Sequence, residues 1–321
     1  MFKFVDENDV LIANCTKTNF ADILKSKWDQ LHDESDIFRY KVDLKERYLD
    51  STYLLQLNPN RSSKRRTPEE INNICQPFNE HKFNFSKVSK EEILLHIIDE
   101  NDDINHTTIL INVSPISRYH SLICPSLSKH LPQVVTKESL QAVLNIMQLA
   151  QDRDIRVGFN SLCALASVNH LHYHLFVEPH DLPVESVKCR HLVKNLYHFL
   201  NYPSPAFCFQ LTNTSSNITD DIFKLISYLI KSSIAHNIFF TRGKNIELDD
   251  GTEVLRVIIW PRKSHIGAKV LPDFNIAVCE LSGWVPVYNT NCYENINRET
   301  LESELRKCSI DNFEQLCEQV K

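Results

Sequence analysis

The chain has 321 residues and a formal net charge of −6, so no overall positive field would draw it to nucleic acid or to an anionic membrane. Five residues are glycine, and the nearest two are eight positions apart. Dinucleotide-binding fingerprints, Walker A loops, kinase glycine loops and nucleophile elbows need two glycines within about six residues, so all four motifs are excluded. The length predicts two domains or one duplicated unit.

The N-terminal ten residues carry Lys3, Asp6, Glu7 and Asp9 among their hydrophobic residues and lack the apolar core of a signal peptide. No stretch approaches 18 uncharged apolar residues, so no membrane span is expected. The ten cysteines include no C-x-x-C pair and are expected to be reduced, buried thiols. These features together predict a cytoplasmic protein.

Hydrophobic periodicity predicts a mixed order of helices and strands in the first half of the chain. Expected helices cover 16–31 and a segment capped by Thr136, and expected strands cover 37–57 (one or two strands), 107–113, 119–124, 156–161 and 169–178. The segment 58–68 holds the dense basic cluster of the chain, and its Asn and Pro content predicts a loop.

The second half of the chain also predicts a mixed order of helices and strands. It predicts a helix capped by Thr219, a hairpin turn at 249–251, two short helices in 298–321, and strands at 207–211, 237–241, 255–260 and 274–281. We therefore expect an N-terminal helical segment (1–36) followed by two α+β halves, 37–190 and 191–321.

Three histidines, His170, His172 and His174, fall within five residues of the segment Asn169-His-Leu-His-Tyr-His-Leu-Phe-Val-Glu178. Strand side chains alternate between faces, so the imidazoles should share one face while the intervening apolar residues enter a core. A polar face with three imidazoles indicates a chemical role.

Three interpretations of this face are open. A neutral imidazole can attack phosphorus while its second ring nitrogen is held by a hydrogen bond. Alternatively, H-x-H can ligate zinc or iron, and His172, His174 and Glu178 resemble part of a cupin motif, although Ala166 and Glu185 replace the glycines that flank it. The third interpretation is a row of histidines that are solvated or packed in the core and have no chemical role. We favour the nucleophile.

The run His170-Leu-His-Tyr-His174 resembles the H-x-H-x-H signature of the histidine-triad (HIT) superfamily. Four segments spread over 50–285 resemble the GDP-hexose phosphorylases of that superfamily: Gln56-Leu-Asn-Pro-Asn-Arg-Ser-Ser-Lys-Arg-Arg66 with Gln76-Pro-Phe and Lys82-Phe-Asn-Phe85; Ile111-Asn-Val-Ser-Pro115; Gly158-Phe-Asn-Ser-Leu162 with Ser167-Val-Asn-His-Leu-His172; and Phe274-Asn-Ile-Ala-Val-Cys-Glu-Leu-Ser-Gly283. Plant members have Gln at the third triad position, whereas His174 resembles the animal GDP-D-glucose phosphorylases.

The resemblance implies an α+β fold of two tandem HIT-like halves with antiparallel sheets and flanking helices, and one triad per chain. It implies phosphorolysis of GDP-glucose: glucose 1-phosphate leaves, a GMP–histidine adduct forms, and inorganic phosphate releases GDP. It implies no cofactor and no metal. A nucleotide hydrolase that releases GMP, a metalloprotein with the triad as ligands, and a nucleotide-binding protein without turnover remain alternatives.

In this family pattern His172 is the nucleophile, and His170 and His174 orient it or contact phosphate oxygens. An acidic chain that binds a diphosphate also needs a local cationic site, and guanidinium suits phosphate better than ammonium. The candidates for this cationic site are Arg61, Arg65 and Arg66, followed by Lys64. Further candidate substrate-binding residues are Asn160, Ser167 and, as a partner for guanine, Glu280.

Overall fold

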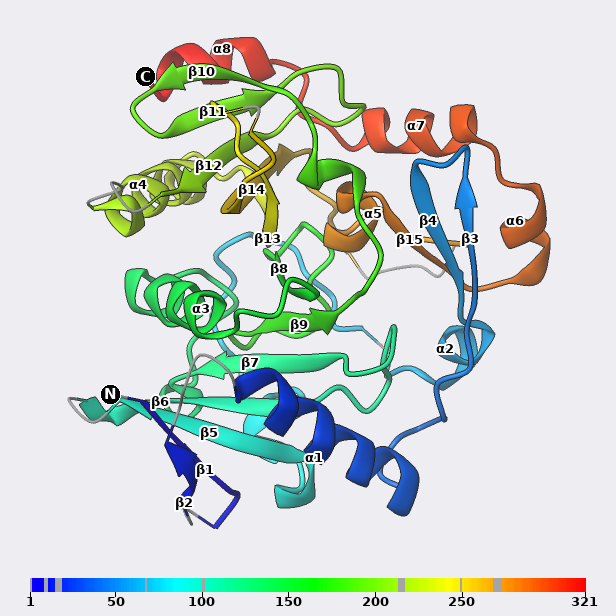
Figure 1. Cartoon of the computed structure of the whole chain (residues 1–321), viewed down its shortest axis with the longest axis vertical. Helices are drawn as coiled ribbons and strands as arrows, with labels where there is room; N and C mark the ends of the chain where they lie inside the picture. The colour runs from blue at the N-terminus through cyan, green and yellow to red at the C-terminus, as the bar shows by residue number, and fades with distance from the viewer. Residues whose placement is uncertain are drawn as a thin grey trace.

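A computed structural model describes residues 2–8, 11–14, 19–66, 68–99, 102–212, 217–248, 250–267 and 273–321. Its largest element is a sheet of 12 strands in the order β10-β11-β12-β14-β13-β8-β9-β7-β6-β5-β1-β2. Every neighbouring pair in this sheet is antiparallel. Figure 1 shows the strands stacked from β10 at the top to β1 and β2 at the bottom.

Two halves of the chain build the sheet with the same sequence of elements. The first half supplies β5 (Ile93–Asp99), β6 (Asp102–Ile111), β7 (Ser121–Pro125), α3 (Lys137–Leu149), β8 (Ile155–Asn160) and β9 (Tyr173–Val177). The second supplies β10 (Cys189–Val193), β11 (Leu196–Phe199), β12 (Phe207–Leu211), α4 (Ile218–Lys231), β13 (Ala235–Lys244) and β14 (Glu253–Arg262). Their strand orders mirror each other about the β8–β13 pair, which confirms the duplicated α+β architecture.

The two faces of the sheet carry different layers. One face packs against α1 (Phe20–Glu34), α3, α4 and α8 (Phe313–Gln319). The other packs against a three-stranded sheet and short helices, namely β3 (Lys45–Leu49), β4 (Tyr53–Leu57), β15 (Trp284–Val287), α5 (Val278–Ser282), α6 (Thr290–Asn295) and α7 (Arg298–Lys307). Figure 1 shows this second layer at the right. In the small sheet β15 runs parallel to β4.

The predicted helices at 16–31, 136 onward and 298–321 are confirmed as α1, α3, and α7 with α8. Thr136 caps α3 by accepting a hydrogen bond from the Ser139 N–H, whereas α4 begins at Ile218 and so contains Thr219 instead of being capped by it. The hairpin between β13 and β14 is confirmed. Thr16 and Asp249 lie outside the described residues.

Three predictions about elements were wrong. The expected strand 274–281 is irregular up to residue 277 and then forms the helix α5, and every residue of α5 is buried, so no one-sided apolar stripe marks it as helical. The expected loop 58–68 contains α2 (Pro59–Lys64), because Asn58 caps its N-terminus and proline is favoured at the first helical position. The strand expected over 169–178 begins at Tyr173.

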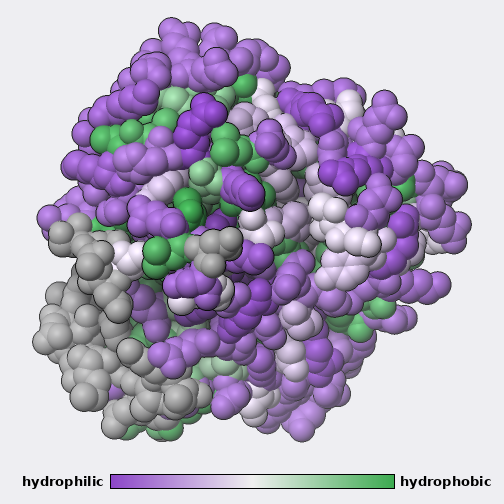
Figure 2. All heavy atoms as spheres, turned by 45° about the horizontal axis from the view of Figure 1, so that its top comes forward, coloured by the Kyte–Doolittle hydropathy of each residue, from purple (hydrophilic) through white to green (hydrophobic). Residues whose placement is uncertain are grey.

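The N-terminal segment contributes β1 (Phe2–Val5) and β2 (Leu11–Asn14) to the sheet edge in addition to α1. No helix among the described residues is both long and apolar enough to cross a membrane. The surface in Figure 2 is mostly hydrophilic with small apolar patches.

Gly158 and Gly283, at the two ends of the packing around α5, occupy positions where a side chain does not fit. A Cβ on Gly158 in β8 would lie 2.7 Å from Val278 Cγ1 of α5. Gly283 has φ of +89° and ends α5, and a Cβ there would lie 2.1 Å from Pro183 Cγ. Both therefore mark close packing, as expected for such a glycine-poor chain, and Gly158 lets α5 lie directly over the central strands.

Candidate active site

His172 lies immediately before β9, on the face of the large sheet that carries α5 and the small sheet. Its Nδ1 lies 2.8 Å from the carbonyl oxygen of His170, so Nδ1 carries the proton and donates, and the lone pair is on Nε2. Burial lowers the pKa of His172 to about 4, against the opposing effect of this hydrogen bond. The side chain is therefore a neutral imidazole at pH 7, with the tautomer that a nucleophile needs.

Gln133 fixes the backbone of His172, a role that sequence reasoning missed. Its Oε1 accepts from the His172 N–H at 2.8 Å, and its Nε2 donates to the carbonyls of His172 and Asn160, each at 3.0 Å. The Gln133 N–H in turn donates to Asn169 Oδ1 at 2.9 Å. One buried amide thus joins the segment before β9 to the end of β8, and no motif spacing marked it.

His170 lies in an aromatic surround on one side of His172. The Phe85 N–H donates to its Nδ1 at 3.1 Å, and the rings of Phe78 and Phe85 lie 5.1 and 5.9 Å from its ring. Burial, with further contributions from His172 and His130, lowers the pKa of His170 to about 4. Phe85 also contacts His172, with ring centroids 4.9 Å apart.

His174 lies on the other side of His172, with ring centroids 5.2 Å apart. Its Nδ1 is 3.1 Å from Nε2 of His120, a residue to which the sequence assigned no role. The Ile116 N–H donates to Nδ1 of His120 at 2.9 Å, so a neutral His120 carries its proton on Nε2 and donates to His174. Burial, then His174, Arg61 and His172, hold the pKa of His120 well below its usual value.

Two of the predicted arginines lie together beyond His120. Arg61 donates to the Ser114 carbonyl and interacts with the hydroxyls of Tyr40 and Tyr288, and Arg65 lies close enough to Arg61 and Tyr288 to interact with both. Within the described part of the chain neither arginine pairs with a carboxylate. Buried atoms there that lack a hydrogen-bond partner are Arg61 Nε, Arg65 Nε, Arg65 Nη2, Ser114 Oγ and Ser117 Oγ.

The structure separates the other two basic candidates from this pair. Lys64 is exposed on α2 and donates to Asn60 Oδ1 at 3.1 Å. The Arg66 guanidinium lies 3.1 Å from the centroid of the Phe83 ring. Arg66 and Phe83 share a cavity of about 230 Å³ with Ser167, whose side chain is exposed beside the triad segment.

Asn160 and Glu280 both support α5. Asn160 Oδ1 accepts from Asn237 Nδ2 at 2.6 Å and from the Val278 N–H at 3.1 Å. Glu280 is buried, and its Oε2 accepts from the Ala277 N–H at 2.9 Å. Each side chain therefore has a structural contact, and a role of either in binding substrate stays a prediction.

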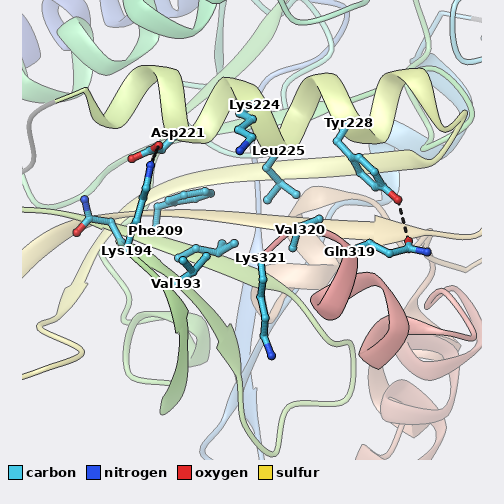
Figure 3. Close-up of a pocket in the computed structure, with 12 residues that line it drawn as sticks. Val193, Lys194, Phe209, Asp221, Lys224, Leu225, Tyr228, Gln319, Val320 and Lys321 are labelled. Carbon is cyan, nitrogen blue, oxygen red and sulfur yellow. Dashed lines mark hydrogen bonds and ion pairs between the residues drawn. The ribbon is translucent and has the colours of Figure 1, made fainter.

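A separate apolar pocket of about 140 Å³ lies between α4, β10 to β12 and the end of the chain, and none of the predicted site residues lines it. Figure 3 shows Phe209, Leu225 and Val320 facing its interior, with Lys194 paired to Asp221 at its rim. The catalytic candidates lie around β9 and α2 instead.

Comparisons with known proteins agree with the duplicated fold. Models of a GDPGP1-like N-terminal domain and a GDPGP1-like C-terminal domain match residues 19–176 and 180–321. The chain belongs to the GDPGP1-like family. It is 35% identical over 303 residues to "GDP-D-glucose phosphorylase 1" of Danio rerio. This alignment covers 92% of this chain and 88% of the relative.

More distant matches of this GDPGP1-like protein follow the same pattern. It is 29% identical over 304 residues to "GDP-L-galactose phosphorylase 2" of Arabidopsis thaliana, covering 85% of this chain and 69% of the relative. The structure of yeast Ap4A phosphorylase Apa2 in complex with Ap4A superposes with a TM-score of 0.61 at 15% identity, covering 91% and 97% of the two chains. This superposition shows a common fold and confirms the HIT-like architecture.

Both matched domains of the GDPGP1-like protein build the candidate site. The triad, His120, Arg61 and Arg65 lie in the N-terminal match, whereas Tyr288 and α5 come from the C-terminal match. The contacts of Tyr288 with Arg61 and of Val278 with Asn160 join the two domains at the site.

Proposed function

We propose that this protein catalyses the phosphorolysis of GDP-D-glucose to GDP and glucose 1-phosphate through a GMP–His172 intermediate. The observation that carries the proposal is the state of His172: a neutral ring, held through Nδ1 by the His170 carbonyl, with its lone pair on Nε2. The activity named for the 35% identical relative supplies the substrate class.

The reaction proceeds in two displacements. His172 Nε2 attacks the α-phosphorus, a P–N bond forms, and the bond from that phosphorus to the oxygen of glucose 1-phosphate breaks. An oxygen of inorganic phosphate then attacks the same phosphorus, the P–N bond breaks, and GDP leaves. Because His120 places the His174 proton on Nε2, His174 can donate a hydrogen bond to a phosphate oxygen or to the departing group.

Arg61 and Arg65 would hold the phosphate that leaves in the first step and enters in the second. Two neighbouring guanidinium groups without a carboxylate partner are electrostatically unbalanced until an anion binds. On the opposite side of His172, the Arg66 and Ser167 cavity and the aromatic surround of His170 suit the nucleotide. We further propose that Asn160 contacts the substrate and that Glu280 pairs with guanine. Lys64, at the rim of the site, would also contact the substrate.

We also propose domain limits at 1–36, 37–190 and 191–321, and a cytoplasmic location. The mirrored strand orders support a division into halves between β9 and β10, at least two residues before the proposed limit at 190. The nine described cysteines are free thiols, which suits a reducing compartment.

The decisive experiment traps the intermediate. Wild-type protein is mixed with GDP-glucose, with and without inorganic phosphate, and is examined by intact mass while the products are identified. We expect a GMP adduct without phosphate, GDP plus glucose 1-phosphate with it, and neither in His172→Ala. An adduct on His172→Ala would eliminate His172 as nucleophile, and phosphate-independent GMP would indicate a hydrolase. A metal ion that is bound by the wild type and lost in His172→Ala would favour metal ligation by the triad.

A further inference from the structure

A second cluster of chemically active side chains lies outside the triad. It consists of Glu46 on β3, Glu178 directly after β9, and His180, and one ligand atom from each lies within 4.8 Å of the others. We propose that this cluster is a binding site for a divalent transition-metal ion, with zinc as the preferred ion. The site goes beyond the proposed reaction, which needs no metal.

The orientation of His180 is the first observation that supports a metal. Its Nδ1 lies 2.6 Å from Glu178 Oε1, and the same oxygen accepts from the His180 backbone N–H at 3.0 Å. Glu178 is 2% exposed, so this carboxylate holds the ring from within the protein. Metal-ligating histidines characteristically donate their other ring N–H to a carboxylate in this way, which leaves the lone pair on Nε2.

The space in front of this lone pair is the second observation. His180 Nε2 lies 3.9 Å from Glu46 Oε2, too far for a hydrogen bond. In the neutral tautomer both atoms are electron-pair donors that face each other. Two zinc–ligand bonds of about 2.0–2.2 Å would span this separation, so a shared cation would satisfy both groups.

Gln56 supplies the third observation. Gln56 and Glu46 are cross-strand partners on β4 and β3, and Gln56 Nε2 donates to Glu46 Oε1 at 2.6 Å. Gln56 is 1% exposed, and its Oε1 is a buried acceptor without a hydrogen-bond partner in the described part of the chain. The hydrogen bond from Gln56 holds Glu46 Oε1, so Oε2 is the carboxylate oxygen that faces His180 Nε2.

The donor set decides the class of metal. One imidazole nitrogen with carboxylate oxygens is a mixed set that suits zinc better than magnesium or calcium, since those two ions prefer oxygen alone. The ion would link β9, four residues after His174, to the β3–β4 hairpin, whose chain continues into α2 with Arg61 and Arg65. It would thereby fix α2, with Arg61 and the following Arg65, relative to the triad.

The test uses the full chain, stripped with a chelator and titrated with zinc chloride or magnesium chloride by calorimetry, with thermal unfolding in parallel. We expect one zinc per chain, a midpoint temperature that rises with zinc, and no comparable effect of magnesium. His180→Ala and Glu46→Gln should each weaken zinc binding at least about 10-fold. His81→Ala is the matched control, because His81 Nε2 lies 3.8 Å from Glu80 Oε1 on the exposed surface.

Three outcomes would overturn the proposal: no zinc binding by the wild type, unchanged binding by both His180→Ala and Glu46→Gln, or binding that is lost in His172→Ala but retained in His180→Ala. The last outcome would place the ion on the triad. Far-ultraviolet circular dichroism of each metal-free variant separates loss of a ligand from loss of the fold, and Glu46→Gln, which keeps the size of the side chain, provides the variant least disturbed in packing.

Discussion

His120 Nε2 lies 3.1 Å from His174 Nδ1, and this contact determines what the third histidine of the triad can offer to substrate. With the Ile116 N–H donating to the far nitrogen of His120, proton positions are fixed along the pair, and His174 presents Nε2–H as a donor. The Gln that plant relatives of the resembled family carry at this position can donate through its amide without such a partner. A neutral histidine needs His120 to select the tautomer.

Replacing His120 should therefore slow catalysis only while residue 174 is histidine. His120→Ala should lower kcat roughly 10-fold, the rate equivalent of one hydrogen bond of about 1.4 kcal/mol. The same change in a His174→Gln background should have a much smaller effect. The measurement is a double-mutant cycle on phosphate-dependent GDP formation, with the tautomer of His174 followed by ¹⁵N NMR. Equal effects in both backgrounds would mean that His120 contributes by packing and does not act through the tautomer of His174.

We expect Arg65 to lower the stability of the folded chain and to contribute to phosphate binding. Burial, and then the nearby Arg61, hold the pKa of its guanidinium below the usual value, while Tyr288 opposes the shift, and two of its nitrogens lack partners. Arg65→Met should leave stability unchanged or raised, yet increase the KM for phosphate at least 10-fold and abolish the stabilisation of the protein by added phosphate. Lys64→Met, one residue earlier and exposed, is the control and should change neither quantity. A stability loss in Arg65→Met without a change in KM would contradict the proposed anion site.

Gln133 should affect both stability and turnover. Gln133→Ala would leave the buried backbone N–H and C=O of His172 without their present partners, at a cost of about 1–3 kcal/mol per group at most. We expect a lower midpoint of urea unfolding and a lower kcat, since the nucleophile loses its fixed backbone. Gln141→Ala on α3, where the side chain is exposed, should preserve both. Normal kcat in Gln133→Ala would show that the other contacts of the triad suffice.

The free energy of unfolding should decrease as the pH is lowered through the range in which buried histidines gain protons on unfolding. Burial lowers the pKa of His170, His172 and His236 to about 4 in the folded chain, whereas the unfolded value is about 6.5. Between these values the unfolded state binds more protons, so the free energy of unfolding decreases as pH falls from about 6.5 to about 4 and is unaffected by these groups above that range. Urea unfolding across this range measures the slope.

Two variants test the assignment of that slope. His236→Ala removes one of the buried histidines with a lowered pKa, among which His120 also counts, and should make the slope shallower because fewer protons are taken up on unfolding. His81→Ala removes an exposed histidine and should leave the slope as it is. An identical slope in His236→Ala and wild type would mean that the pH dependence comes from other groups.

Local patterns accounted for much of the architecture. Apolar stripes identified α1 and α3, and a β-branched run identified β6, because these elements bury one face or a whole strand and their composition shows it. The same reasoning failed for α5, where burial on all sides removes the periodic signal, and for α2, where Asn58 and Pro59 begin a helix as readily as they form a turn. The position of His170 before β9 also escaped it.

The sequence by itself determined that a glycine-poor, acidic chain carries three histidines within five residues and, elsewhere, a cluster of arginines, and its motifs indicated the family. Only the tertiary structure decided which nitrogens carry protons and which arginines act together. His120 and Gln133 reach the triad from segments 54 and 39 residues away, and four neighbouring basic residues diverge into a half-buried pair, a cation over Phe83 and an exposed lysine. Hydrogen bonding and burial are set by groups that meet across the sheet, and such meetings have no fixed spacing along the chain.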